Sequence, residues 1–127
     1  MKDEEFQEAA ELYVQMSKNP RVLAEAKFYA HIQLRGISLY YDKRGLTNVV
    51  SDIFSGDEEL LNVMRIAISF GVSVELAELA KAPLQEIGIT RIISNFAKKH
   101  GIMKSRAADA VRVLAVGLGM GNISIKT

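Results

Sequence analysis

The chain has 127 residues, enough for one domain with its own hydrophobic core, and 49% of them are hydrophobic, which excludes an intrinsically disordered protein. It contains no cysteine, which excludes disulfides, thiolate metal sites and cysteine nucleophiles and fits a reducing compartment. The opening stretch MKDEEFQEAAEL lacks the pattern of a signal peptide, and no apolar run is long enough to span a bilayer. We therefore expect a cytoplasmic protein with no membrane partner.

Charge is distributed unevenly along the chain, although the net charge is only +1. Residues 1–62 contain seven Lys or Arg against eleven Asp or Glu, whereas residues 63–127 contain nine against four. Between Arg91 and Arg112 there are six basic residues and one acidic residue, Asp109. Such a basic segment favours a polyanionic partner such as nucleic acid. The alternative is internal complementarity, in which the acidic half packs against the basic half or against a neighbouring subunit.

Hydrophobic periodicity predicts an all-α fold, a compact multi-helix single domain over residues 1–127. The predicted helices cover, in chain order, residues 3–17, 20–35, 47–54, 56–70, 74–82, 91–100 and 104–116. The stretch ISLYYDKRG is rich in β-forming residues but short, so we expect a helix extension or an irregular turn closed by Gly45. Residues 84–87 are expected to form a single turn of helix.

The ends of these helices are predicted from capping residues and glycines. Side chains that can accept a hydrogen bond from the first free N–H groups predict N-caps at Asn19, Ser55, Ser73 and Thr90. Ser55 with Glu58 also matches a capping box. Glycine tolerates the left-handed conformation that ends a helix, which predicts stops at Gly36, Gly71 and Gly101. Helix 20–35 is apolar on two adjacent stripes, which predicts a central position in the fold.

The stretch FAKKHGIMKSRAADAVRVL, residues 96–114, carries the strongest functional signal. Three small residues follow one another at a fixed spacing: Ala97, then Gly101 four positions later, then Ala107 six positions after the glycine. The glycine suits the turn, and the small residues let two helices approach closely. Over about 20 residues this spacing resembles the helix-turn-helix unit of DNA-binding regulators. Together with the preceding helix, the helix-turn-helix-like portion covers residues 74–116.

The resemblance implies which residues contact nucleic acid. In such units the N-terminal end of the second helix enters the major groove. Arg106 could then donate two hydrogen bonds to guanine or clamp a phosphate, and Ser105 could bind a phosphate at the helix N-terminus. The full candidate set of nucleic-acid-binding residues is Lys98, Lys99, Lys104, Ser105, Arg106 and Arg112. The sequence thus favours a nucleic-acid-binding regulator or accessory factor that contacts phosphates and bases through residues 98–112.

Two features of the same stretch oppose that interpretation. Residues 110–116 are almost all apolar, so this half of the helix should be buried and only its first turn or two can face a ligand. Asp109 adds a negative charge beside the proposed surface, although an Asp can accept from cytosine. The alternative function is a non-catalytic helical interaction subunit that forms a homo-oligomer or docks into a larger protein complex.

Two further motifs carry weaker signals. The run GLGMG lacks the preceding strand and following helix that a phosphate-binding loop needs, so residues 117–127 are predicted to form a glycine-rich tail or a short C-terminal strand. In LYYDKRG, Tyr40 and Tyr41 stand beside Lys43 and Arg44. Such rings can stack single-stranded bases, but tyrosines more often anchor a turn to the core with the hydroxyl in water.

The sequence predicts neither catalysis nor a cofactor. It shows no nucleophile elbow and no Ser-His-Asp order, and its acidic residues cluster at helix starts, where capping explains them. His31 and His100 have no partner at metal-ligand spacing. We expect His31 to be partly buried and hydrogen-bonded, and His100 to be a cation at a helix C-terminus. The protein is therefore expected to be a non-enzyme without a bound metal.

Overall fold

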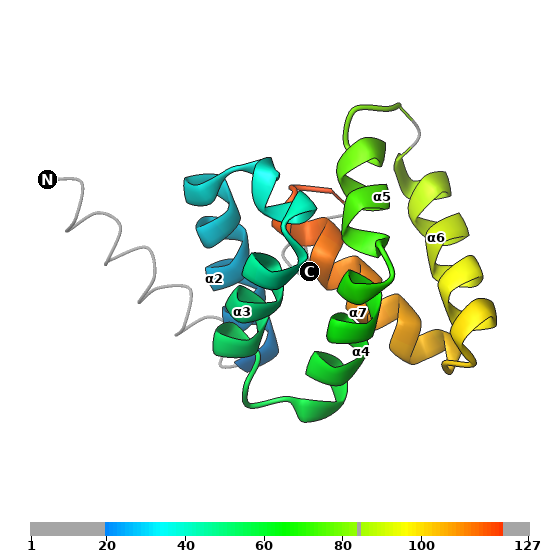
Figure 1. Ribbon diagram of the computed structural model, residues 1–127, viewed down its shortest axis with the longest axis horizontal. Helices are drawn as coiled ribbons and strands as arrows, with labels where there is room; N and C mark the ends of the chain where they lie inside the picture. Colours follow the sequence, from blue (N-terminus) through cyan, green and yellow to red (C-terminus); the bar gives the residue numbers. More distant parts are fainter. Residues whose placement is uncertain (1–19, 84, 121–127) are drawn as a thin grey trace, which may run out of the picture.

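The computed structural model describes residues 20–83 and 85–120. Within these residues the protein is all-helical, with six α-helices, one 3-10 helix and no strand (Figure 1). The elements are, in chain order, α2 (Pro20–Arg35), η1 (Ile37–Tyr41), α3 (Lys43–Ile53), α4 (Glu58–Ser69), α5 (Val72–Leu79), α6 (Gln85–His100) and α7 (Lys104–Gly117). The all-α prediction is confirmed. The predicted helix over residues 3–17 and the tail residues 121–127 lie outside the described residues.

The last helix, α7, is the centre of the fold. It packs against α2, α4, α5 and α6, and in Figure 1 it crosses behind α4 and α5. Its residues from position 110 onward are buried almost without interruption, and they are Ala110, Val111, Val113, Leu114, Ala115, Val116 and Gly117. The prediction that an all-round apolar helix is buried is therefore confirmed. The prediction of a central α2 is wrong, because α2 buries only Glu25, Phe28 and Ile32 and leaves Leu34 85% exposed.

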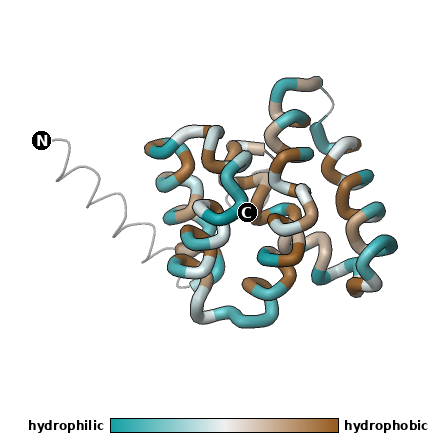
Figure 2. The backbone as a smooth tube through the Cα atoms, viewed as in Figure 1, coloured by the Kyte–Doolittle hydropathy of each residue, from teal (hydrophilic) through white to brown (hydrophobic). Residues whose placement is uncertain are grey.

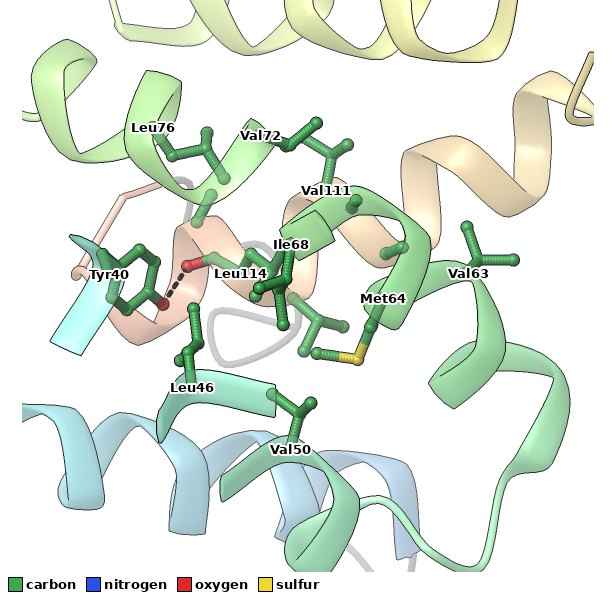
Figure 3. Packing of buried hydrophobic residues seen from close by; sticks show 14 of the residues in the cluster. Tyr40, Leu46, Val50, Val63, Met64, Ile68, Val72, Leu76, Val111 and Leu114 are labelled. Carbon is green, nitrogen blue, oxygen red and sulfur yellow. Dashed lines mark hydrogen bonds between the residues drawn. The ribbon is translucent and has the colours of Figure 1, made fainter. Parts of the chain in front are cut away.

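The core lies around α7, where α2, α4, α5 and α6 pack against it, and α3 adds residues from beside α4 (Figure 3). Met64 and Ile68 of α4 are fully buried, as are Val111 and Leu114 of α7. The helices around α7 bury only some of their residues, and Figure 2 shows hydrophobic and hydrophilic residues alternating along them. This pattern lets several short helices share one apolar interior.

Tyr40 connects η1 to the end of α7. Its side chain is fully buried, and its hydroxyl donates a hydrogen bond of 2.5 Å to the backbone carbonyl of Leu114 (Figure 3). That carbonyl belongs to the last turn of α7, where no later helical N–H is available, since Leu118 N donates to Ala115 O instead. The tyrosine therefore satisfies a polar group that the helix end leaves open. The expectation of a water-exposed hydroxyl does not hold for Tyr40.

The predicted glycine stops agree with the structure. Gly36, Gly71 and Gly101 follow the ends of α2, α4 and α6, with φ angles of 90°, 89° and 62°. A side chain is disfavoured at such positive φ angles, so glycine ends the helix at little cost. These positions set the lengths of three helices.

The predicted helix starts agree less well. Helix α3 begins at Lys43, before the expected position 47, because Asp42 accepts a hydrogen bond of 3.0 Å from Gly45 N. Helix α4 is capped by Asp57, which accepts from Leu60 N at 3.2 Å, and not by Ser55. A turn closed by Asp57 N donating to Phe54 O precedes that cap, so the chain cannot be helical from Ser55 onward.

Two further starts were predicted in the wrong place. Helix α5 begins at Val72 directly after Gly71, which leaves Ser73 buried inside the helix and not at its N-cap. Helix α6 begins at Gln85, so the expected cap Thr90 lies inside it and its hydroxyl donates to Glu86 O at 3.0 Å. A hydroxyl can bond to the carbonyl four residues earlier in a helix, which is why a threonine does not always mark a helix start.

The beginning of the predicted glycine-rich tail is part of the packed fold. Gly117 is the last residue of α7 and is buried. A Cβ atom placed on it would lie 2.6 Å from Phe28 Cε2 and closer still to the Tyr40 hydroxyl. Met120 is buried as well, and its N–H donates to Ala115 O at 2.9 Å. Glycine at position 117 therefore permits a close approach between α7, α2 and η1.

Among the described helices, none is by itself long and apolar enough to cross a membrane; only the bent pair formed by α4 and α5 passes that test, by length and composition.

Candidate functional site

The turn between α6 and α7 brings four of the six predicted residues together. Gly101 adopts a left-handed conformation, and Ile102 N donates to Ala97 O at 3.0 Å, which closes the end of α6. Ala97 and Ala107 are buried where the two helices pack against each other. The small residues thus occupy the close-packed positions that the spacing predicted.

Lys98 and Lys99 lie in the last turn of α6 and are exposed. Both line a hollow of about 510 Å³ between the start of α5 and the end of α6. The hollow is completed by Phe70, Gly71, Val72, Glu75, Asn95, Phe96 and His100. Apart from Glu75, the charged side chains of this lining are basic.

Lys104 and Ser105 lie in the first turn of α7 and are also exposed. The preceding residue, Met103, makes no side-chain capping hydrogen bond, and the first turn contains no acidic residue. The free N–H groups at this helix start carry partial positive charge, which adds to that of Lys104. The surface beside the turn is consequently positive on both helices.

Arg106 points toward α4 and not away from the protein. Its guanidinium lies 2.6 Å from the carboxylate of Glu59. Asp109, one turn later, lies 3.8 Å from Arg21 of α2, and Arg21 also contacts Asp57 at 3.2 Å. These ion pairs join the starts of α2, α4 and α7. Asp109, expected to weaken phosphate binding, is engaged in this network.

Arg112 lies apart from the other candidate residues. Its guanidinium contacts the carboxylate of Glu86 in the first turn of α6 at 3.0 Å, and its Nη1 atom is buried without a hydrogen-bond partner in the described part of the chain. Glu86 stands twelve residues before Lys98, about 18 Å along the helix at 1.5 Å per residue. The structure therefore gathers Lys98, Lys99, Lys104 and Ser105 around the turn and places Arg112 toward the other end of α6.

An aromatic pair at the hollow was not identified from the sequence. The ring of Phe70 is 62% exposed and lies against His100, with ring centroids 4.2 Å apart and planes tilted by 37°. His100 also contacts the buried ring of Phe96, at a centroid distance of 5.4 Å. Helical spacing places Phe70 three residues after the buried Ala67, which predicts burial. Among the described residues, the packing of α4, α5 and α6 leaves most of this side chain uncovered, and one sequence does not reveal that packing.

The tyrosines of LYYDKRG are engaged within the protein. Burial raises the pKa of Tyr40 well above its ordinary value, so its phenol stays protonated. Tyr41 donates a hydrogen bond to Glu78, which raises the pKa of Tyr41 and lowers the pKa of that carboxyl group. Lys43 donates to Ser69 O at 3.0 Å. This motif therefore ties η1 and α3 to neighbouring helices.

The histidines differ in their surroundings. His31 is half-buried, and its Nε2 atom has no hydrogen-bond partner among the described residues, contrary to the expected bond. His100 lies at the end of α6, as expected, and stacks on Phe70. Residues 20–83 and 85–120 contain no group of three or more acidic or histidine side chains arranged to hold a metal ion. No protein-family model, curated protein or solved structure matches this chain.

Proposed function

We propose that this chain is a small non-catalytic nucleic-acid-binding protein that contacts phosphates through the basic surface at the α6–α7 turn. Lys98, Lys99, Lys104 and Ser105 form that surface. Arg106 adds a further phosphate contact when its guanidinium leaves the carboxylate of Glu59 and binds a phosphate instead. Arg112 gives positive charge from farther along α7.

One observation carries this proposal. Within the described residues, no carboxylate lies within ion-pair distance of Lys98, Lys99 or Lys104, whereas Arg106 and Arg112 each have one. Three lysines thus flank one turn with their charges uncompensated by direct ion pairs. Uncompensated like charges repel one another, and a polyanion relieves that repulsion while its counterions are released.

The local backbone supports the same ligand. The start of α7 presents free N–H groups beside Lys104, and Ser105 has a hydroxyl that can donate to a phosphate oxygen. Lys98 and Lys99 lie just across the turn. A phosphate backbone that follows the turn would meet positive charge from both helices.

The experiment is fluorescence anisotropy with labelled single-stranded and duplex oligonucleotides at low salt. Lys98→Gln, Lys99→Gln and Lys104→Gln are combined in one variant. The matched control replaces three exposed basic residues elsewhere, Lys27, Arg44 and Arg91, by Gln, so that the net charge changes equally. We expect the first variant to lose at least tenfold in affinity, because each phosphate contact contributes separately, and the control to lose little.

Two outcomes would overturn the proposal. One is that the wild-type protein binds no oligonucleotide at low salt. The other is that both variants lose affinity equally, which would mean that net charge and not this surface drives binding. Thermal unfolding of each variant checks that the fold is intact.

A second candidate function is a helical interaction subunit that forms a homo-oligomer. The apolar residues 110–116 no longer support it, because they are buried within the chain. A different observation does: Leu34 at the end of α2 and Ile37 at the start of η1 are 85% and 41% exposed. If this face joins two copies, Leu34→Glu should convert an oligomer to a monomer in light scattering. A wild-type protein that is monomeric at high concentration would exclude this homo-oligomer.

A further inference from the structure

The hollow beside Lys98 and Lys99 has a shape and a lining that suit one particular form of nucleic acid. Its volume of about 510 Å³ falls within the range of about 300–1,000 Å³ typical of small-molecule sites, so it can admit a nucleobase. One wall comes from the α4–α5 junction, with Phe70 and Val72, and the other from the end of α6. Both walls include aromatic or apolar groups as well as charges.

The aromatic rings form a supported platform. Phe70 exposes most of its ring, and His100 holds it from one side at a centroid distance of 4.2 Å. His100 rests in turn on the buried Phe96. The rings of Phe70, His100 and Phe96 therefore contact one another in a row that runs from the protein surface to the core. A ring that is fixed in this way loses little conformational freedom when another flat ring stacks on it.

The charges around the platform suit the backbone of the same ligand. Lys98 and Lys99 line the hollow from α6, next to His100. Glu75 lines it from α5 and disfavours a phosphate on that side. A base on Phe70 would thus have its phosphates directed toward the lysines, away from Glu75.

The same structure disfavours duplex readout. In a duplex complex α7 would have to be the recognition helix, yet it is buried from Ala110 onward except at Arg112, and both Arg106 and Arg112 are paired with carboxylates. Little of it remains to enter a major groove. A stacking ring, in contrast, needs a base whose face is open, and only unpaired nucleotides offer that.

We propose that the Phe70–His100 pair stacks an unpaired base of a single-stranded nucleic acid whose flanking phosphates bind Lys98 and Lys99. This inference rests on the proposed nucleic-acid binding and adds the form of the ligand. It also assigns a binding role to Phe70, which the helix-turn-helix resemblance did not include.

The test uses the full chain and two substitutions at one position. Phe70→Leu keeps an apolar side chain but removes the ring. Phe70→Trp keeps a ring and introduces the only tryptophan of the chain, which has none of its own. The matched control is Ile87→Ala, since Ile87 is 58% exposed and lies at the opposite end of α6.

The probes are labelled oligothymidylate, oligoadenylate and a blunt-ended duplex without a loop, together with an acidic peptide that contains one aromatic residue. We expect Phe70→Leu to weaken binding of the single strands by about 5- to 150-fold, the range for loss of one stacked base, and to leave duplex binding unchanged. Ile87→Ala should bind like the wild type. In Phe70→Trp, the single strands should bind with near wild-type affinity and quench the introduced tryptophan.

The outcomes separate this inference from the proposed function. If Phe70→Leu binds single strands as the wild type does while the lysine variant still loses affinity, the stacking platform is wrong and the nucleic-acid binding stands. If single strands bind Phe70→Trp without quenching the introduced tryptophan, the stacking platform is likewise wrong and the proposed nucleic-acid binding still stands. If only the acidic peptide binds, both proposals fail. Circular dichroism of Phe70→Leu confirms folding, which we expect to be intact because the ring is largely exposed.

Discussion

The guanidinium of Arg106 lies 2.6 Å from the carboxylate of Glu59, so the first turn of α7 is joined to the first turn of α4. Both side chains are about half exposed or more. Such an exposed pair contributes little to stability, about 0–1 kcal/mol, and can be exchanged for another partner. The arginine with the most direct expected role in nucleic-acid contact is therefore held by a carboxylate when no ligand is bound.

The first prediction concerns that carboxylate. Glu59→Gln should strengthen nucleic-acid binding about two- to fivefold, because it releases Arg106 and removes a negative charge near the phosphates, an effect of about 0.5–1 kcal/mol. The measurement is anisotropy at low salt. Glu58→Gln is the matched control, since Glu58 lies in the same first turn of α4. Equal gains in both variants would indicate a general charge effect and contradict the role given to Arg106.

The second prediction concerns Gly117. Gly117→Ala should lower the free energy of unfolding by about 1–3 kcal/mol, because the new methyl group would overlap the buried Phe28 and Tyr40 side chains. Chemical denaturation measures this change. Gly56→Ala serves as the control, since no atom lies within 4 Å of a Cβ at that position. Unchanged stability in Gly117→Ala would show that α7 and α2 do not approach as closely as described.

The third prediction concerns the hydroxyl of Tyr40. Tyr40→Phe keeps the ring and removes the hydrogen bond to Leu114 O, which leaves a carbonyl at the end of α7 without its partner. Loss of one buried hydrogen bond should cost about 1–2 kcal/mol of the free energy of unfolding. Tyr41→Phe, whose hydrogen bond to Glu78 is exposed, should cost clearly less. Equal effects in the two variants would argue against a special role for the Tyr40 bond.

The fourth prediction follows from the raised pKa of Tyr40. The folded state holds the phenol protonated, whereas the unfolded state releases that proton above its ordinary pKa of about 10. The stabilisation is therefore complete below pH 10 and declines as the pH rises above it. Denaturation at increasing alkaline pH should show a steeper loss of stability for the wild type than for Tyr40→Phe. Parallel losses would contradict this explanation.

The fold class could be predicted from the sequence because its signals are local. The apolar run at residues 110–116 indicates a buried helix, and each helix-ending glycine at positions 36, 71 and 101 determines its own backbone conformation. Helix starts were less predictable. Asp57 and Ser55 are both good caps, and the choice between them depends on the turn at Phe54.

The candidate site could be predicted only in part, because ion pairs and exposure depend on tertiary packing. The positions of Lys98, Lys99 and Lys104 around one turn follow from the spacing about Gly101. Arg112 and Glu86 lie on different helices, so their ion pair depends on how α6 and α7 pack. The exposure of Phe70 likewise depends on how the neighbouring helices pack. No local pattern encodes such relationships.

The measurement that tests the central claim most directly is the salt dependence of single-strand binding. For the wild type, the slope of log K against log salt concentration should be about −3, because the three lysines and Arg106 each neutralise a phosphate and contribute about −0.7 each. The variant with Lys98, Lys99 and Lys104 replaced by Gln should have a slope of only about −0.7, from the remaining contact of Arg106. A wild-type affinity that does not change with salt, or a slope that is the same in the variant, would contradict the proposed function.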